Sequence, residues 1–231
     1  GLTDTPIGWS DLDSAKAWQG RLWENKAKPI KQILDRLAFE GGFCYTFSAA
    51  GVLKYIFAKN SYSSADHTLD KNDISNVQIS HTPISDMIMD ITVNYNNHPA
   101  KSEYRSQATD SDGTLRTKYN IASTEQKHVF NLDYLTTGQG ADLDCDTDDP
   151  NDGFMNYYGN LSVSPRIIIQ AEIVNPAKFN MELGDICQFS TMIPTKAFNQ
   201  TFSFKYYMIT SITRSSGKIT CKFINITPGE Q

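Results

Sequence analysis

An acidic segment, residues 142–152, is the strongest candidate in this chain for a site that carries chemistry. It contains six aspartates in eleven residues. Carboxylates this close repel one another unless a cation or water screens their charge, and oxygen ligands at alternate positions suit Ca²⁺. The sequence therefore predicts a calcium site with these ligands: Asp142, Asp144, Asp146, Asp148 and Asp152.

The segment matches only part of the calcium-binding loop of EF-hand proteins. Asp144, Asp146 and Asp148 occupy the first three ligand positions of that loop. Asp149 stands where the loop needs a glycine, and Met155 stands where it needs a glutamate that binds with both oxygens. The alternative interpretation is a solvated surface loop that holds no metal.

Other residue types that carry chemistry form no recognisable pattern. There is no Gly-x-Ser-x-Gly nucleophile turn and no Gly-x-x-x-x-Gly-Lys phosphate loop. The histidines have no partner at zinc-ligand spacing; they are His67, His81, His98 and His128. The tyrosine pairs 157–158 and 206–207 suit stacking on a sugar or packing in a core. We therefore expect no catalytic residues and no cofactor other than calcium.

Composition narrows the class of protein. The chain has 231 residues, of which 39% are hydrophobic and 11% aromatic, enough for one large or two small domains. Its net charge is −5 and no basic tract stands out, so we expect no specific binding of nucleic acid. No apolar run approaches the roughly 20 residues that span a bilayer, so we expect no membrane span.

The cysteines predict free thiols rather than disulfides or a metal site. They are scattered, and no Cys-x-x-Cys occurs. Three of them, Cys44, Cys187 and Cys221, lie in apolar strand-like runs, which is typical of buried thiols. The fourth is Cys145, inside the acidic segment.

The clearest structural unit lies at residues 28–57. Pro29 suits the start of a helix, and Gly41-Gly42 suits its end. Two apolar runs, 43–47 and 52–57, follow and predict a hairpin whose turn ends at Gly51. The helix should cover one face of this hairpin with side chains at helical spacing: Ile30, Ile33, Leu34 and Leu37.

Alternating apolar residues predict most of the other elements. The clearest case is 87–95, and further strands are predicted at 76–81, 128–135, 166–174, 186–189, 202–212 and 218–226. The last two should form a hairpin with its turn at 214–217. Residues 96–124 are polar and predict a long excursion with a hairpin at 110–113. A short helix is predicted at 154–161.

The expected fold is α+β and β-dominated, with β-barrel-like or mixed-sheet domains and one firm helix packed on a sheet. Residues 1–27 should form an N-terminal arm, and its Trp18 and Trp23 suit a subunit interface. Residues 28–231 should form the main region. Two interleaved subdomains are expected there, 28–95 with 125–174, and 175–231.

Four passages, taken in order, resemble the tail-hub and tail-tip proteins of tailed bacteriophages. They are KPIKQILDRLAFEGGFCYTFSAAGVLKYIF, NDISNVQISHTPISDMIMDITVNYN, SPRIIIQAEI followed by FNMELGDICQF, and YYMITSITRSSGKITCKFINI. In that family a helix leads into a hairpin, a strand ending in Val-x-Tyr follows a proline, and Leu-Gly-Asp-Ile precedes a strand. Together the passages span most of residues 28–226.

The resemblance implies β-barrel-like domains that assemble into a ring, typically a trimer, at the distal end of the tail tube. It implies a structural virion protein of the tail tip or baseplate hub, made in the bacterial host cytoplasm. Its partners would be other copies of itself and other tail proteins, and no catalytic residue is carried over. The acidic segment is not part of the family's pattern.

Two other functions stay open at this point. The first is an adhesion or ligand-binding module in which the acidic segment holds Ca²⁺. The second is a hydrolase of cell wall or polysaccharide, built from carboxylates that come together only in the fold. Stable oligomers favour the tail protein, a melting shift with Ca²⁺ favours the module, and polymer cleavage favours the hydrolase.

Overall fold

The structure is a computed structural model, and it describes residues 5–16, 18, 20–24, 26–59, 61–136, 153–190, 196–197, 200–201 and 205–226. The chain divides into two compact units. Unit 1 comprises residues 1–60 and 84–164, and unit 2 comprises 61–83 and 165–230. This division differs from the expected one because residues 61–83 supply strands that pair with the C-terminal part of the chain.

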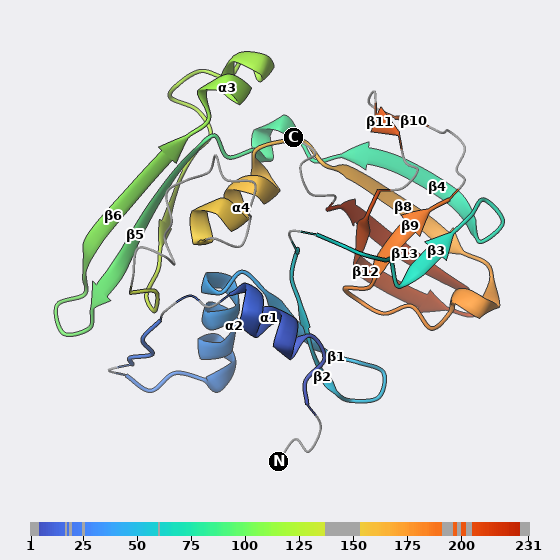
Figure 1. The fold of residues 1–231 in the computed structure, drawn as a ribbon, viewed down its shortest axis with the longest axis horizontal. Coiled ribbons are helices and arrows are strands. Elements are labelled where there is room, and N and C mark those ends of the chain that lie inside the picture. The colour runs from blue at the N-terminus through green and yellow to red at the C-terminus, as the bar shows by residue number, and fades with distance from the viewer. Residues whose placement is uncertain are drawn as a thin grey trace. The chain divides into compact units, whose positions relative to one another are not determined.

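Unit 2 is built on a curled six-stranded sheet (Figure 1). In spatial order its strands are β3 His67–Leu69, β9 Ile186–Phe189, β12 Tyr207–Ser215, β13 Lys218–Asn225, β8 Ile167–Ile173 and β4 Ile74–His81. All neighbours are antiparallel except β3 and β9. Smaller elements are η2 Pro176–Lys178 and the pair β10 Lys196–Ala197 and β11 Gln200–Thr201.

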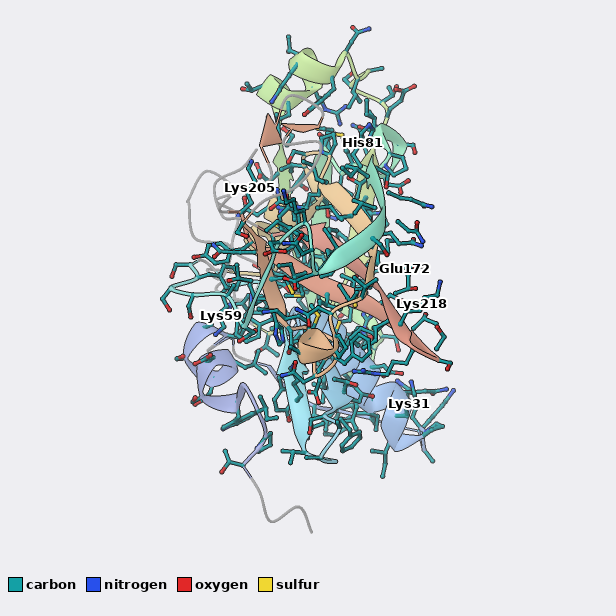
Figure 2. The ribbon with its side chains drawn as sticks, turned by 90° about the vertical axis from the view of Figure 1, so that its right-hand side faces the viewer. Lys31, Lys59, His81, Glu172, Lys205 and Lys218 are labelled. Carbon is teal, nitrogen blue, oxygen red and sulfur yellow. The ribbon has the colours of Figure 1, made fainter. Side chains whose placement is uncertain are left out.

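One face of this sheet carries the core of unit 2. Alternate residues of β8 are buried, as period-two patterning requires. They pack with Phe189, Tyr207 and Phe223, none of which is more than 1% exposed. On the outer side, Glu172 of β8 pairs with Lys218 of β13 at 2.5 Å, and both are labelled in Figure 2. The strands predicted at 76–81, 166–174 and 186–189 and the final hairpin are therefore confirmed.

Unit 1 combines small sheets with short helices. A three-stranded sheet has the order β6-β5-β7, and a separate hairpin pairs β1 with β2. In chain order the elements are α1 Trp9–Ala15, α2 Ile30–Glu40, β1 Cys44–Phe47, β2 Leu53–Ile56, η1 Ile84–Asp86, β5 Asp90–His98, β6 Glu103–Ser111, α3 Gly113–Tyr119, β7 Lys127–Asn131 and α4 Phe154–Ser162. The β-dominated α+β class is confirmed, but the described residues hold three α-helices besides the one firmly predicted.

An aromatic cluster joins α2, β7 and α4 into the core of unit 1. The Phe39 ring of α2 lies 5.9 Å from Phe130 of β7 and 5.6 Å from Phe154 of α4, measured between centroids. Tyr158 of α4 completes the group and donates its hydroxyl to the Phe39 carbonyl at 2.9 Å. The predicted helix therefore packs on the three-stranded sheet through Phe39. It also contacts β1 of the hairpin, where Tyr45 donates its hydroxyl to Asp35 at 2.7 Å.

The helix and hairpin at 28–57 form as predicted, but the buried face of α2 differs from the predicted one. Ile30 is 75% exposed and Leu34 is 44% exposed, whereas Ala38 and Glu40 are buried. The reason is that only the second half of α2 packs against the rest of unit 1. Its first turns project outward, with Lys31 among the exposed side chains (Figure 2).

The helix ends at a glycine whose conformation the fold requires. Gly42 has φ of 65°, a left-handed conformation that favours glycine. A Cβ at Gly42 would lie 2.8 Å from the Tyr157 ring, so a side chain there would also clash. Turn closure by Gly51, with φ of 78°, confirms the hairpin.

The prediction for residues 96–124 is wrong. Residues 103–111 form β6, which pairs with β5 in a long hairpin, and residues 113–119 form α3. Polar residues suit β6 because one face of this strand is exposed. Asp112 begins α3 by accepting a hydrogen bond from the Leu115 N–H at 2.7 Å, which is a typical N-cap contact. The polar residues at 110–113 that predicted a hairpin turn therefore mark the start of a helix.

Candidate functional site

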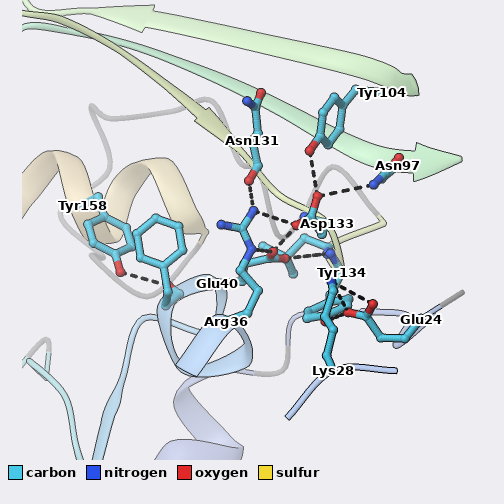
Figure 3. A network of polar contacts seen from close by, with 12 residues as sticks. Glu24, Lys28, Arg36, Glu40, Asn97, Tyr104, Asn131, Asp133, Tyr134 and Tyr158 are labelled. Carbon is cyan, nitrogen blue, oxygen red and sulfur yellow. Dashed lines mark hydrogen bonds and ion pairs between the residues drawn. The ribbon is translucent and has the colours of Figure 1, made fainter. Parts of the chain in front are cut away.

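The best-built polar site in unit 1 surrounds Glu40, at the end of α2 (Figure 3). Its side chain is 2% exposed. The carboxylate accepts the backbone N–H groups of Asp133 at 2.7 Å, Tyr134 at 2.8 Å and Leu135 at 3.0 Å. These bonds fix the segment after β7 to the end of the helix, 93 residues away in sequence.

Arg36, one turn earlier on α2, completes the site. Its Nε lies 2.7 Å from Glu40, and its Nη2 lies 3.2 Å from Asp133 and donates to the Asn131 carbonyl. Burial raises the pKa of the Glu40 carboxyl, and the backbone donors and Arg36 act against that rise. Glu40 is therefore a structural acceptor, with its oxygens already engaged by the chain.

The network extends from Asp133 to the strands. Tyr104 of β6 donates its hydroxyl to Asp133 at 2.7 Å, and Asn97 of β5 donates its side-chain amide at 3.3 Å. Burial, followed by the hydrogen bond to Asp133, raises the pKa of Tyr104. The hydroxyl therefore stays protonated and keeps donating at neutral pH.

On the other side of the network, Tyr134 donates its hydroxyl to Glu24, which also pairs with Lys28 at 2.7 Å. The hydrogen bonds from Lys28 and Tyr134 lower the pKa of Glu24. These contacts tie the residues that precede α2 to the segment that follows β7.

The N-terminal residues 7–24, which we call the strap, are attached to the rest of unit 1 near both of their ends. At one end Ile7 bonds to β2, donating to the Leu53 carbonyl at 2.8 Å and accepting from the Tyr55 N–H at 2.9 Å. At the other end Gly20 forms a bridge with Leu135. Helix α1 lies between these attachments, and its Leu12 is 5% exposed.

A cavity of about 300 Å³ lies between the strap and the body of unit 1. The strap contributes Trp9, Leu12 and Trp18, and the body contributes Leu37, Phe43 and Tyr55. Trp9 is 46% exposed and lines the cavity, so the cavity opens to solvent beside it. Its volume is at the lower end of ligand pockets, which run from about 300 to 1,000 Å³.

The aromatic rings of this cavity are held in place by one another and by a cation. The Trp9 and Phe43 rings lie 5.7 and 5.5 Å from Tyr55. The Lys16 ammonium lies 3.6 Å from the centroid of Tyr157 and 4.3 Å from that of Trp18, in cation–π contact. The cavity walls are therefore formed before any ligand arrives.

Apolar side chains are also exposed on unit 1 outside the cavity. Leu22 and Trp23, at the end of the strap, are each 57% exposed. Ile30 on α2 and Phe47 on β1 are exposed to 75% and 61%. Exposed apolar residues in such number suit a surface that a partner covers.

The predicted calcium ligands, from Asp142 to Asp152, lie outside the described residues. Within the part of the chain that the structure describes, no group of three or more His, Cys, Asp or Glu side chains is placed to hold a metal. The histidines make separate contacts there. His67 lies 3.0 Å from Asp185, His81 2.9 Å from the Thr82 carbonyl, and His128 packs on Phe130.

All three described cysteines are free thiols, as predicted, but only two of them are buried. Cys187 and Cys221 are free and buried, and burial raises the pKa of Cys221 to about 11. Cys44, the first residue of β1, is free but exposed. Tyr157 and Tyr207 are buried, so the tyrosine pairs serve packing.

Sequence reasoning missed Glu40 and the cavity. Glu40 directly precedes the glycine pair, and a charged residue among Leu37, Ala38 and Phe39 was a signal of a buried acceptor. The cavity had no local signal because its walls come from residues 9–55 and 134–135.

Compared by sequence, the chain matches no protein-family model and no curated protein. By structure it is similar to the tail protein from Neisseria meningitidis MC58, with a TM-score of 0.50 and 11% identity, over 95% of this chain and 67% of that one. It is also similar to the 43 kDa tail protein of prophage MuSo2 from Shewanella oneidensis, with a TM-score of 0.49 and 13% identity, over 90% of this chain. This chain covers 57% of the Shewanella protein's length.

The likeness to the Neisseria tail protein, at 11% identity, shows a shared fold. It confirms, at the level of the fold, the resemblance to phage tail proteins that the sequence motifs indicated. The described helices include none that is both long and apolar enough to cross a membrane.

Proposed function

We propose that this chain is a structural part of a phage tail, which assembles with other subunits and catalyses no reaction. The observation that carries the proposal is the fold shared with the Neisseria tail protein over 95% of this chain. The motifs at 28–57 and 206–226 support it, because they form the helix–hairpin unit and the final hairpin that the resemblance implied.

In the finer form of the proposal, copies of the chain form a ring, with a trimer favoured, at the tail tip or baseplate hub. Its partners are its own copies and neighbouring tail proteins, and its final location is the virion after synthesis in the host cytoplasm. The exposed apolar side chains of unit 1 support this form, because a subunit of a closed ring needs surface for a neighbour to cover.

Labelling of virions tests the proposal. Antibodies against the chain, detected with gold particles in electron micrographs, should mark one end of the tail. Virions grown with a deletion of the gene should lack that end structure, and the full-length protein should restore it. Absence of the chain from purified virions would contradict the proposal, and labelling along the whole tube would contradict its placement at the tip.

Calcium binding by the acidic segment is a separate proposal that rests on the sequence alone. Unfolding followed with and without Ca²⁺ tests it, because a ligand that binds only the folded state raises the melting temperature. We expect a rise that a chelator reverses and that is lost when Asp144 and Asp146 are both changed to Asn. An unchanged melting temperature in millimolar Ca²⁺ would contradict calcium binding by the acidic segment.

A further inference from the structure

The strap of unit 1 carries both halves of a complementary contact. Its first half lines an aromatic cavity of about 300 Å³ that opens beside Trp9. Its second half exposes Trp23, which is 57% exposed and does not line that cavity. Trp is the residue type most often found at the energetic centre of protein interfaces, where it fills a pocket in the partner.

The size and chemistry of the cavity fit one large aromatic side chain. Its volume is at the lower end of ligand pockets, and rings and aliphatic side chains make up most of its walls. Three charged side chains, Asp13, Lys16 and Glu40, also line it. Aromatic rings gain energy from edge contacts with other rings beyond their burial. An indole therefore suits this cavity better than a charged or a long flexible side chain.

The charges around the two halves are complementary. Asp13 lies at the cavity, is exposed, and makes no ion pair with the described residues. Lys26 follows Trp23 by three residues, is exposed, and likewise has no acidic partner in the described part of the chain. Three residues of chain span at most about 10 Å, so Lys26 stays near the mouth of a cavity that Trp23 has entered.

We propose that Trp23 of one copy inserts into the strap cavity of a second copy, with Lys26 of the first pairing with Asp13 of the second. The contact is head-to-tail, because anchor and cavity are different surfaces of one chain. Such contacts close into rings when the rotation between neighbours allows it. The inference rests on the proposed self-assembly and names the surface that produces it.

Sedimentation velocity of the full chain over a range of concentrations tests the contact. Trp23→Ala should weaken self-association by at least about 10-fold, since loss of a central anchor typically costs that much or more. Trp23→Phe should weaken it less, because a ring still fills the cavity. Val174→Ala removes an apolar side chain that is 42% exposed on unit 2, and it should leave association unchanged.

Exchanging the charges at positions 13 and 26 tests whether the strap cavity is the surface that receives Trp23. Asp13→Lys and Lys26→Asp should each weaken association, and the double variant should regain most of it. Both positions are exposed, so far-UV circular dichroism of each variant should match the wild type.

The outcomes separate this contact from the proposed function. Association unchanged by Trp23→Ala, or lost equally in the double charge variant, overturns the contact while self-assembly stands. A wild-type chain that stays monomeric to about 100 µM, a concentration at which even weak specific contacts form, overturns the contact and the ring together. Tail labelling in virions would then still support a tail role through other partners.

Discussion

The two units of this molecule are stabilised in different ways. Unit 2 has one six-stranded sheet whose core residues, such as Ile169, Cys221 and Phe223, are fully buried. Unit 1 has small sheets and short helices, joined by the aromatic cluster and by the buried carboxylate of Glu40. Unit 1 also exposes most of the large apolar side chains that lie at the surface of the described residues.

The difference indicates that the two units have different roles in assembly. A continuous sheet with an apolar face forms a stable body without help from partners. Small pieces held by polar contacts leave apolar side chains uncovered, and those side chains gain from association. Unit 2 is thus suited to be a rigid body, and unit 1 to be the part that contacts other subunits.

Phe223→Ala is the change with the largest expected effect on unit 2. The ring is fully buried and packs edge-on against Phe189, at 5.4 Å, so its loss should destabilise unit 2 by about 3–5 kcal/mol. Urea unfolding followed by far-UV circular dichroism measures this loss. Lys222→Ala, at an exposed position of the same strand, should cost under about 0.5 kcal/mol.

Tryptophan fluorescence shows whether the effect stays in unit 2. Trp9, Trp18 and Trp23, which are the three tryptophans of the chain, belong to unit 1. The fluorescence transition of Phe223→Ala should therefore match that of the wild type. An equal shift of both transitions would mean that the two units unfold as one.

Glu40→Ala is the corresponding change in unit 1. It leaves three backbone N–H groups and Arg36 without their acceptor, so we expect a loss of about 3 kcal/mol in the fluorescence transition. Glu40→Gln keeps one acceptor oxygen and should lose less. Asp35→Ala, an exposed position on the same helix, should leave the midpoint almost unchanged. If Glu40→Ala lowered only the unfolding midpoint that circular dichroism reports for unit 2, Glu40 would not be a stabilising residue of unit 1.

Asp90 makes the stability of unit 1 depend on pH. Burial acts to raise its pKa, but hydrogen bonds from Arg116 and Lys127 hold that pKa below its usual 3.8. Stability from Asp90 is therefore present above about pH 4 and is lost as pH falls through the lowered pKa. Asp90→Asn should cost about 2 kcal/mol at pH 7, and the difference from wild type should shrink by pH 2.5. A difference that is constant with pH would contradict this reading.

Asp112→Ala should have the smallest effect of the four. It removes the N-cap of α3, for which we expect a loss of about 1 kcal/mol in urea unfolding. Asp112→Asn keeps a side-chain oxygen and should restore most of that loss. If both variants lose the same free energy of unfolding, the capping hydrogen bond is not what stabilises the start of α3.

The elements with strong local patterns were predictable from sequence. The helix and hairpin at 28–57 and the strands of unit 2 follow from periodicity and from glycines at turns. Strand β6 was missed because its polar residues face solvent, and α3 was missed because Asp112 suits a turn and a cap equally well.

The candidate site was mostly beyond local patterns. The apolar stripe of α2 predicted a buried face, but Ile30 and Leu34 are exposed because the first half of the helix projects. Glu40 binds residues more than 90 positions away, and the cavity joins the strap to α2, β2 and residues 134–135. Such pairings depend on tertiary structure, and no spacing in the sequence encodes them.

The central claim is that unit 1 associates and unit 2 does not. Thermal unfolding at protein concentrations from about 1 to 100 µM tests it directly, because association makes a melting temperature depend on concentration. The midpoint seen by tryptophan fluorescence should rise with concentration, while the midpoint of the β-sheet signal in unit 2 stays fixed. A fluorescence midpoint that does not move, or a rise confined to the sheet of unit 2, would contradict the account.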